Sequence, residues 1–460
     1  MSAGPDPVPG STPDAVPAQS PSPLSRRGFL TLGAGAALAG VVGGRLAWGS
    51  LVTEHLEQVT PPPAGTGTAP PGSSAPRAAD RRVLVIVQMS GGNDGLNTLV
   101  PAGDGAYFDA RPTLQVPEAA VLGLRGTDRY GFNPVLAPLV PVWERKELVV
   151  LDAIGLPGQT RSHFAAMDAW WSATPGQALR SGWVGRWLDR TGDPSNPLRA
   201  IALGGGSPAL MGEHSIATVV QDPSAFTLRT PKGTPLERVR DAFLATAAPL
   251  VADETFAAAQ SSVPSALRAV DLLARAAAGS DDGEGTAPAS PKGARSGSAA
   301  TAATELLRTA AGIIDLDLGT QVILVAVNGF DTHADQTRRQ DELLADVATG
   351  IATFLDLVRG QGRADDVLVM TTSEFGRRVH ENGSGTDHGN GNVQLLAGPM
   401  VAGGQVVGAA DLTNLDAGDL KASIDTRSLY ANALDWLSGG DGPTDEVLAA
   451  PYDRLGLVRF

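Results

Sequence analysis

The chain has 460 residues, of which 35 are Lys or Arg and 49 are Asp or Glu, and it contains no cysteine. The formal net charge of −14 argues against nucleic acid or an anionic membrane surface as the main partner. Without cysteine there are no disulfides, thiolate metal sites or cysteine nucleophile, so any metal must take His, carboxylate, hydroxyl or amide ligands.

The N-terminal segment has the pattern of an export signal. Residues 25–30 read SRRGFL, a twin-arginine pattern, and a Gly- and Ala-rich apolar run follows to about Val42. That run is shorter than the roughly 20 apolar residues that a membrane span needs. We therefore expect residues 1–49 to be a twin-arginine signal peptide, the alternative being an arginine pair before a core helix. The protein is then expected in the periplasm, the cell envelope or outside the cell.

The rest of the chain is expected to form one domain behind a tether. Residues 50–80 are rich in Pro, Gly, Ser and Thr, which predicts a flexible tether. The folded domain is expected to cover residues 81–460. A low-complexity stretch at about 279–300 lies between helical patterns at 265–278 and 301–314. It predicts a surface insertion rather than a domain boundary.

Three apolar, β-branched runs each lead directly into polar residues. They are residues 83–87, 322–327 and 367–370. Such runs without polar alternation are typical of strands covered by helices on both faces, and helical patterns such as 341–358 separate them. The sequence therefore predicts an α/β fold with a doubly wound, mostly parallel sheet. Ligands of such sheets bind beyond the carboxyl ends of the strands.

The polar residues at these strand ends include four candidate metal ligands. Asp94 lies in GGNDG, Asp331 and His333 lie in GFDTHADQ, and Glu374 lies in TTSEFGR. Each motif has a structural alternative: a tight turn for GGNDG, a helix cap for Asp331, and for Glu374 an ion pair with one of the two arginines that follow it. An Asp-x-His pair on extended chain directs both side chains to one side, as a metal-binding edge requires.

Two loop segments complete the candidate site. Ser162 and His163, in RSHF, precede a helical pattern, so Ser162 is either an N-cap or a hydroxyl in the positive field of a helix N-terminus. His388, in TDHGNG, is flanked by Asp387 and glycines and precedes an apolar run, which favours a ligand on a loop. Three other histidines lack such a context and are expected to play no part in the site: His55, His214 and His380.

Taken together, these motifs resemble a known family. The leader, GGNDG, RSHF, GFDTHADQ, TTSEFGR and DHGNG in this order are similar to the secreted proteins of domain of unknown function 1501 (DUF1501), over about residues 81–460. That family is more remotely similar to the alkaline phosphatase and sulfatase superfamily. The resemblance implies an alkaline-phosphatase-like fold with one or two divalent metals per chain, from among Zn²⁺, Mn²⁺, Mg²⁺ and Ca²⁺.

The superfamily resemblance also implies roles for single residues. Asp331, His333 and His388 would hold one metal, and Asp94 and Glu374 would hold the second. Ser162 would be the nucleophile that forms a covalent intermediate.

One superfamily element departs from its pattern here. The usual Thr-x-Asp-His-Gly appears as Ser373-Glu374-Phe375-Gly376, and the phenyl ring of Phe375 cannot bind a metal. The resemblance then leaves His163 to replace the missing histidine, or Arg377 to supply, as a catalytic group, positive charge in place of a weakly bound second metal.

The expected function is that of a metal-dependent hydrolase of phosphate or sulfate esters, with small molecules or glycans as substrates. The alternative is a non-catalytic, metal-containing binding protein of the cell envelope. Phe375 favours it, as does the single residue between Asp331 and His333, where the superfamily usually has three. A Ser–His esterase built on Ser162 and His163 is disfavoured, because adjacent residues cannot easily pair as nucleophile and base and G-x-S-x-G is missing.

Overall fold

The computed structural model describes residues 81–177, 179–192, 196, 198–215, 217–221, 233–246, 267 and 303–460. The predicted signal peptide and tether (1–80), the predicted insertion (279–300) and nearly all of the helix predicted at 265–278 lie outside these residues. Within the described ranges, every helix is too short or too polar to cross a lipid bilayer.

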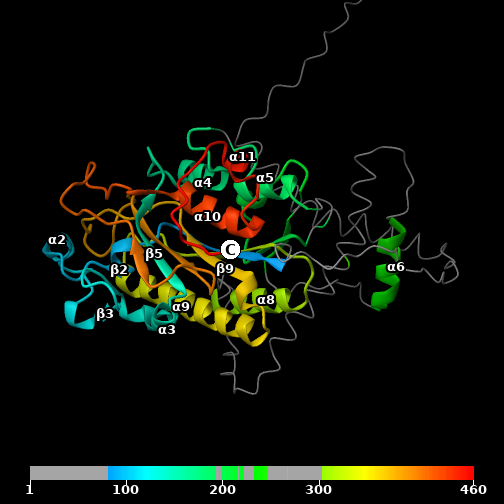
Figure 1. Ribbon diagram of the computed structural model, residues 1–460, viewed down its shortest axis with the longest axis horizontal. Helices are drawn as coiled ribbons and strands as arrows, with labels where there is room; N and C mark the ends of the chain where they lie inside the picture. The colour runs from blue at the N-terminus through cyan, green and yellow to red at the C-terminus, as the bar shows by residue number, and fades with distance from the viewer. Residues whose placement is uncertain are drawn as a thin grey trace, which may run out of the picture. The chain divides into compact units, whose positions relative to one another are not determined.

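A nine-stranded sheet forms the centre of the fold (Figure 1). Its strands are β1 (Val83–Ser90), β5 (Leu148–Gly155), β6 (Ala200–Leu203), β7 (Thr218–Val220), β8 (Val322–Asn328), β9 (Val367–Thr372), β10 (Asn392–Ala397), β11 (Gln405–Val407) and β12 (Ile424–Asp425). They run in the order β11-β5-β10-β9-β1-β8-β6-β7, and β12 also pairs with β5. Every pairing is parallel except those of β10, which is antiparallel to β5 and β9.

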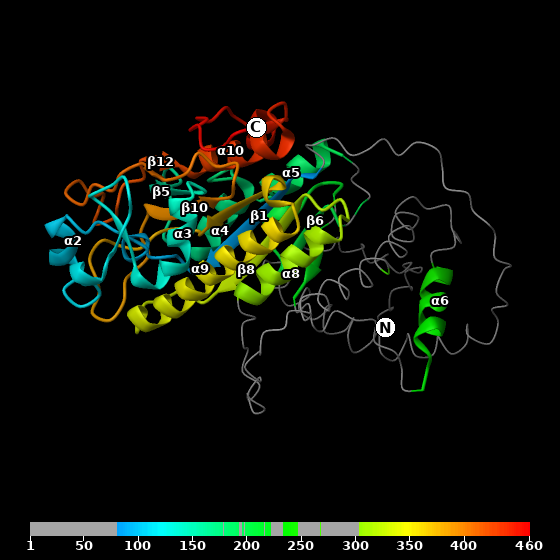
Figure 2. The same cartoon turned by 60° about the horizontal axis from the view of Figure 1, so that its bottom comes forward.

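Helices cover both faces of this sheet. The helices of the described residues are α2 (Gly105–Ala110), α3 (Val140–Glu144), α4 (His163–Ser172), α5 (Trp183–Arg190), α8 (Ala303–Asp315), α9 (Gln336–Gly360), α10 (Thr426–Ser438) and α11 (Thr444–Leu448), and α6 (Leu236–Thr246) is a further helix described by itself. Helices α8 and α9 lie on one face, and α4, α5, α10 and α11 lie on the other (Figure 2). The doubly wound, mostly parallel α/β fold is therefore confirmed.

Smaller elements fill the connections. The 3₁₀ turns are η2 (Gly95–Asn97), η3 (Glu118–Ala120), η4 (Pro134–Leu139), η5 (Pro208–Leu210) and η7 (Ala364–Asp366), and a separate three-stranded antiparallel sheet consists of β2 (Leu99–Val100), β4 (Gly131–Phe132) and β3 (Leu122–Gly123).

The burial of β1 explains why its sequence has no polar alternation. Val85 and Val87 belong to the apolar cluster on the side of α8 and α9, whereas Leu84 and Ile86 belong to the cluster on the side of α5 and α10. Successive side chains of a strand point to opposite faces, so both faces must be apolar when helices cover both.

Strand register brings the candidate loops together. Ser90 of β1 pairs with Asn328 of β8, and Gln88 of β1 pairs with Thr372 of β9. The polar segments after these three strands therefore meet at one edge. Because β10 runs the other way, the loop before Asn392 reaches the same edge. The sheet topology thus explains how residues far apart in the sequence form one site.

Candidate metal centre

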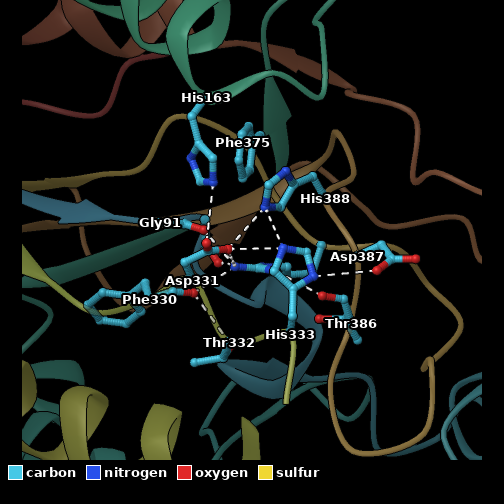
Figure 3. Close-up of polar contacts among 12 residues, drawn as sticks. Gly91, His163, Phe330, Asp331, Thr332, His333, Phe375, Thr386, Asp387 and His388 are labelled. Carbon is cyan, nitrogen blue, oxygen red and sulfur yellow. Dashed lines mark hydrogen bonds and ion pairs between the residues drawn. The ribbon is translucent and has the colours of Figure 1, made fainter.

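Three histidines surround Asp331 at the carboxyl edge of the sheet (Figure 3). Oδ1 of Asp331 lies 3.1 Å from Nε2 of His333 and 3.0 Å from Nε2 of His388, and these two nitrogens are 2.9 Å apart. Oδ2 of Asp331 lies 3.5 Å from Nε2 of His163. The ligand atoms that His163, Asp331 and His388 can offer all lie within 4.8 Å of one another. The expectation that the Asp-x-His pair would point to one side agrees with this geometry.

The second ring nitrogen of each histidine is also engaged. The Nδ1 contacts are those of His388 with the carbonyl oxygen of Arg161 at 2.9 Å, His163 with Oε1 of Glu374 at 3.1 Å, and His333 with Oδ1 of Asp387 at 3.4 Å. A carbonyl or an ionised carboxylate only accepts, so each Nδ1 is assigned the hydrogen, and each Nε2 faces Asp331 with a lone pair on a neutral ring or with an N–H on a protonated ring. Metal-ligating histidines are oriented in this way.

The carboxylate of Asp331 is held in its ionised form. Burial works to raise its pKa, but hydrogen bonds from His388 and Arg377 and the charge of Arg377 outweigh burial and lower the pKa to about 2. An ionised carboxylate is the form that binds a metal.

Arg377 is fully buried beneath this cluster. Burial lowers the pKa of its guanidinium, and Asp331 partly offsets this effect. The guanidinium donates to Oδ1 of Asp331 at 3.1 Å and to four backbone carbonyls, those of Gly91, Gly92, Phe330 and Thr386. It therefore ties together the loops that carry the site. The catalytic role predicted for Arg377 remains a prediction, and these contacts give it a positioning role.

Glu374 is buried against the same loops. Its Oε1 accepts from the backbone N–H of Gly91 at 2.8 Å and faces His163, and among the described residues its Oε2 has no hydrogen-bond partner. The alternative of an ion pair with a following arginine is wrong, because Arg377 pairs with Asp331 and Arg378 pairs with another carboxylate. Glu374 thus faces the site.

The phenyl ring of Phe375 packs between two of the histidines. Its centroid lies 4.3 Å from that of His388 in a stacked arrangement and 5.0 Å from that of His163. A Cβ on Gly92 would lie 2.4 Å from this ring, so the close approach requires glycine there. Phe375 cannot bind a metal itself, but its ring therefore fixes the orientation of two imidazoles.

Ser162 occupies the N-cap position of α4 but does not act as a cap. Its backbone is extended, its side chain makes no capping hydrogen bond, and the residue is exposed. Its carbonyl accepts from the N–H of Ala166 at 2.9 Å, as the first bond of the helix. The hydroxyl group is therefore free of the usual structural role of a serine at this position.

The carboxylate of Asp94 has partners other than the histidines. Its Oδ2 accepts from Arg111 and from Gln336, each at 2.5 Å, and among the described residues its Oδ1 has no hydrogen-bond partner. The ion pair with Arg111 is buried. Metal binding by Asp94 remains a prediction. Sequence reasoning missed both partners: Arg111 lies in no recognisable motif, and Gln336 ends the GFDTHADQ motif, where Asp331 and His333 were the candidates.

Replacement of Gly91 by Ala is expected to destabilise the protein by about 3 kcal/mol or more. Gly91 has φ +123°, and a Cβ there would lie 2.2 Å from the backbone nitrogen of Asp331. Urea unfolding would measure the loss. The control is Gly360→Ala at the end of α9, where a Cβ meets nothing within 4 Å. We expect that control to leave stability unchanged or raise it by about 0.5–1 kcal/mol. Equal stabilities for the two variants would contradict the strain assigned to Gly91.

Fold and site together define a doubly wound α/β protein with a His/Asp group of metal-binding type at the carboxyl edge of its sheet. The chain belongs to the family described as protein of unknown function (DUF1501), whose model matches residues 153–438. This confirms the family predicted from the motifs. None of the curated proteins compared with the chain matches it.

Solved structures from the alkaline phosphatase and sulfatase superfamily show a remote similarity. A protein of the alkaline phosphatase superfamily from Vibrio parahaemolyticus has a TM-score of 0.35 at 9% identity, over 83% of this chain and 73% of that chain. The PsFucS1 sulfatase from Pseudoalteromonas sp. has a TM-score of 0.32 at 14% identity, over 82% and 73%. The phosphonate monoester hydrolase SpPMH from Silicibacter pomeroyi has a TM-score of 0.32 at 10% identity, over 81% and 77%.

Proposed function

We propose that the protein is a metal-dependent hydrolase of phosphate or sulfate esters. The observation that supports this proposal is the convergence of three imidazole Nε2 atoms on the carboxylate of Asp331, each with its Nδ1 held by an acceptor. Lone pairs and an anionic oxygen at these distances repel one another unless positive charge lies among them. A single proton would satisfy only one of these contacts.

The distances and the donor types fit a divalent transition metal. Tetrahedral bonds of about 2.0–2.1 Å place neighbouring ligand atoms about 3.3 Å apart, and the three atoms of Asp331, His333 and His388 are 2.9 to 3.1 Å apart. Two imidazoles and one carboxylate favour Zn²⁺ or Mn²⁺ over the oxygen-preferring Mg²⁺ or Ca²⁺. We assign these three residues as ligands, which leaves a position open for substrate.

A bound ion of this kind would polarise the oxygens of an ester and stabilise developing negative charge. The chain's own groups would carry out the attack and the proton transfer. The Ser162 hydroxyl, at the positive end of α4, would attack the phosphorus or sulfur atom and form a new O–P or O–S bond. The proton of the Ser162 hydroxyl would go to water, and a doubly protonated His163, with its Nδ1 held by Glu374, would give the proton on Nε2 to the leaving oxygen as its bond breaks. Water would then release the acid from Ser162.

Metal content per chain, measured by mass spectrometry on protein purified without chelator, tests this proposal. We expect about one equivalent of metal in the wild type. Asp331→Ala and His388→Ala should each lose it while keeping a folded circular dichroism spectrum. His214→Ala, an exposed histidine outside the site, is the matched control and should keep the metal. Full metal content in both ligand variants would contradict the assignment of Asp331 and His388 as metal ligands.

A second candidate function is that of a non-catalytic, metal-containing binding protein of the cell envelope. The buried ion pair between Asp94 and Arg111 favours it, because the guanidinium occupies an oxygen that a second ion would need. A screen with 4-nitrophenyl phosphate and 4-nitrophenyl sulfate separates the two candidates. Turnover that chelation abolishes supports the hydrolase, and metal without turnover of any ester supports the binding protein.

We also propose export by the twin-arginine route. The proposal rests on SRRGFL at residues 25–30 and the apolar run that follows. We expect replacement of both arginines by lysine to abolish export, and cell fractionation of the variant would measure the loss.

A further inference from the structure

A pocket of about 280 Å³ opens beside the metal-ligand cluster. Its lining residues are Arg161, His333, Arg378, Asp387 and His388. Two of these are histidines of the cluster, so a group bound in the pocket would lie next to the reacting centre. In Figure 3, the rings of His388 and His333 lie between His163 and Asp387. His163 is not among the lining residues, so the pocket lies on the Asp387 side of these two rings.

One buried carboxylate holds both arginines of this pocket. Oδ2 of Asp419 accepts from Nε and Nη2 of Arg161 at 3.0 and 2.8 Å, and its Oδ1 accepts from Nε of Arg378 at 3.3 Å. Nη2 of Arg378 also donates to the carbonyl of Ala417. The side chain of Asp419 is 12% exposed, whereas those of Arg161 and Arg378 are 46% and 32% exposed. The carboxylate thus fixes the two guanidinium groups while leaving them accessible.

Donors remain for a ligand. Among the described residues, Nη1 of Arg161 and Nη1 of Arg378 have no hydrogen-bond partner. The acid that lines the pocket, Asp387, accepts from Asn382 at 2.8 Å and faces His333 at 3.4 Å. Two fixed guanidinium groups with spare N–H donors are suited to an oxyanion.

We propose that Arg161 and Arg378, held by Asp419, bind an acidic group of the substrate next to the ester. This inference rests on the proposed hydrolase function and defines its substrate class. The reacting ester would contact Ser162 and His163, and neither residue lines the pocket, so the group in the pocket is a second one. The substrate is then a polyanion, such as an ester on an acidic glycan, with a sulfate, phosphate or carboxylate beside the scissile group.

Equilibrium dialysis with radiolabelled sulfate tests this proposal on the full chain, as purified and after chelation. We expect two sulfates per metal-loaded chain, one at the metal and one at the arginines, and one per chelated chain. The double variant Arg161→Gln/Arg378→Gln should bind one when metal-loaded and none when chelated. Loss of either arginine alone should weaken the pocket site about tenfold or more. Competition by phosphate or acetate shows which acidic group the pocket prefers.

The matched control is Arg338→Gln/Arg339→Gln on α9, which changes the net charge equally at exposed arginines. It should bind sulfate like the wild type. Two sulfates on the metal-loaded arginine double variant would overturn the proposal. A wild type that binds a single sulfate, lost both on chelation and in the arginine variant, would also overturn it, because the metal and the arginines would then hold the same group. A chain that carries no metal as purified without chelator, and still binds sulfate through its arginines, would instead reject the proposed metal-dependent hydrolase and keep the pocket.

Discussion

Replacement of Arg111 by Met is expected to lower the free energy of unfolding by about 3–5 kcal/mol. The side chain of Arg111 is 0% exposed, and its ion-pair partner Asp94 is 1% exposed. Removal of the guanidinium leaves a carboxylate that is shielded from water and has lost its opposite charge. The loss includes more than one bond, because Arg111 also donates to Asn97 and to the backbone carbonyls of Val379 and Arg378.

The matched control for this prediction is Arg338→Met. Arg338 makes ion pairs within α9, but its side chain is 57% exposed, and exposed pairs of this kind contribute little to stability. Urea unfolding of both variants should be compared with and without chelator. A similar small loss in the two variants would contradict the structural role of the buried pair. A large loss in Arg111→Met that persists without metal would show that Asp94 stabilises the fold independently of any ion.

The sequence predicted the sheet and the edge where the site lies, because continuous apolar strands leave a clear pattern. The runs that became β1, β8 and β9 were found within a few residues of their ends. Strand order follows from pairing between segments far apart in the chain, which periodicity does not encode. The antiparallel direction of β10 is an example, and it determines how His388 reaches Asp331.

The candidate ligands could be predicted because they follow strands in short motifs. The residues that support them could not. Asp419 and Arg111 have no local pattern, and they act through partners up to 268 positions away in the sequence. Whether a carboxylate such as Asp94 faces a metal or an arginine depends on those partners. Tertiary contacts decide this point, and the motif GGNDG alone does not.

The structure distinguishes the two roles considered for Ser162, a helix N-cap and a reactive hydroxyl. Its replacement has the largest expected effect on activity. An N-cap serine accepts from an N–H of the first helical turn, and its loss costs about 1 kcal/mol. The side chain of Ser162 makes no such bond. We therefore expect Ser162→Ala to keep its metal and to change stability by less than about 0.5 kcal/mol. Hydrolysis of 4-nitrophenyl phosphate or sulfate should fall by roughly 10³-fold or more, because the attacking oxygen is gone.

Ser207→Ala is the control for a serine that does cap. The hydroxyl of Ser207 accepts from the N–H of Ala209 at 3.3 Å and donates to Gln88 at 3.1 Å. Its loss should cost about 1 kcal/mol and leave hydrolysis unchanged. The two variants are thus expected to show opposite effects on stability and turnover. Retention of activity by Ser162→Ala would exclude it as the nucleophile, and retention together with bound metal would direct the mechanism toward attack by water at the same centre.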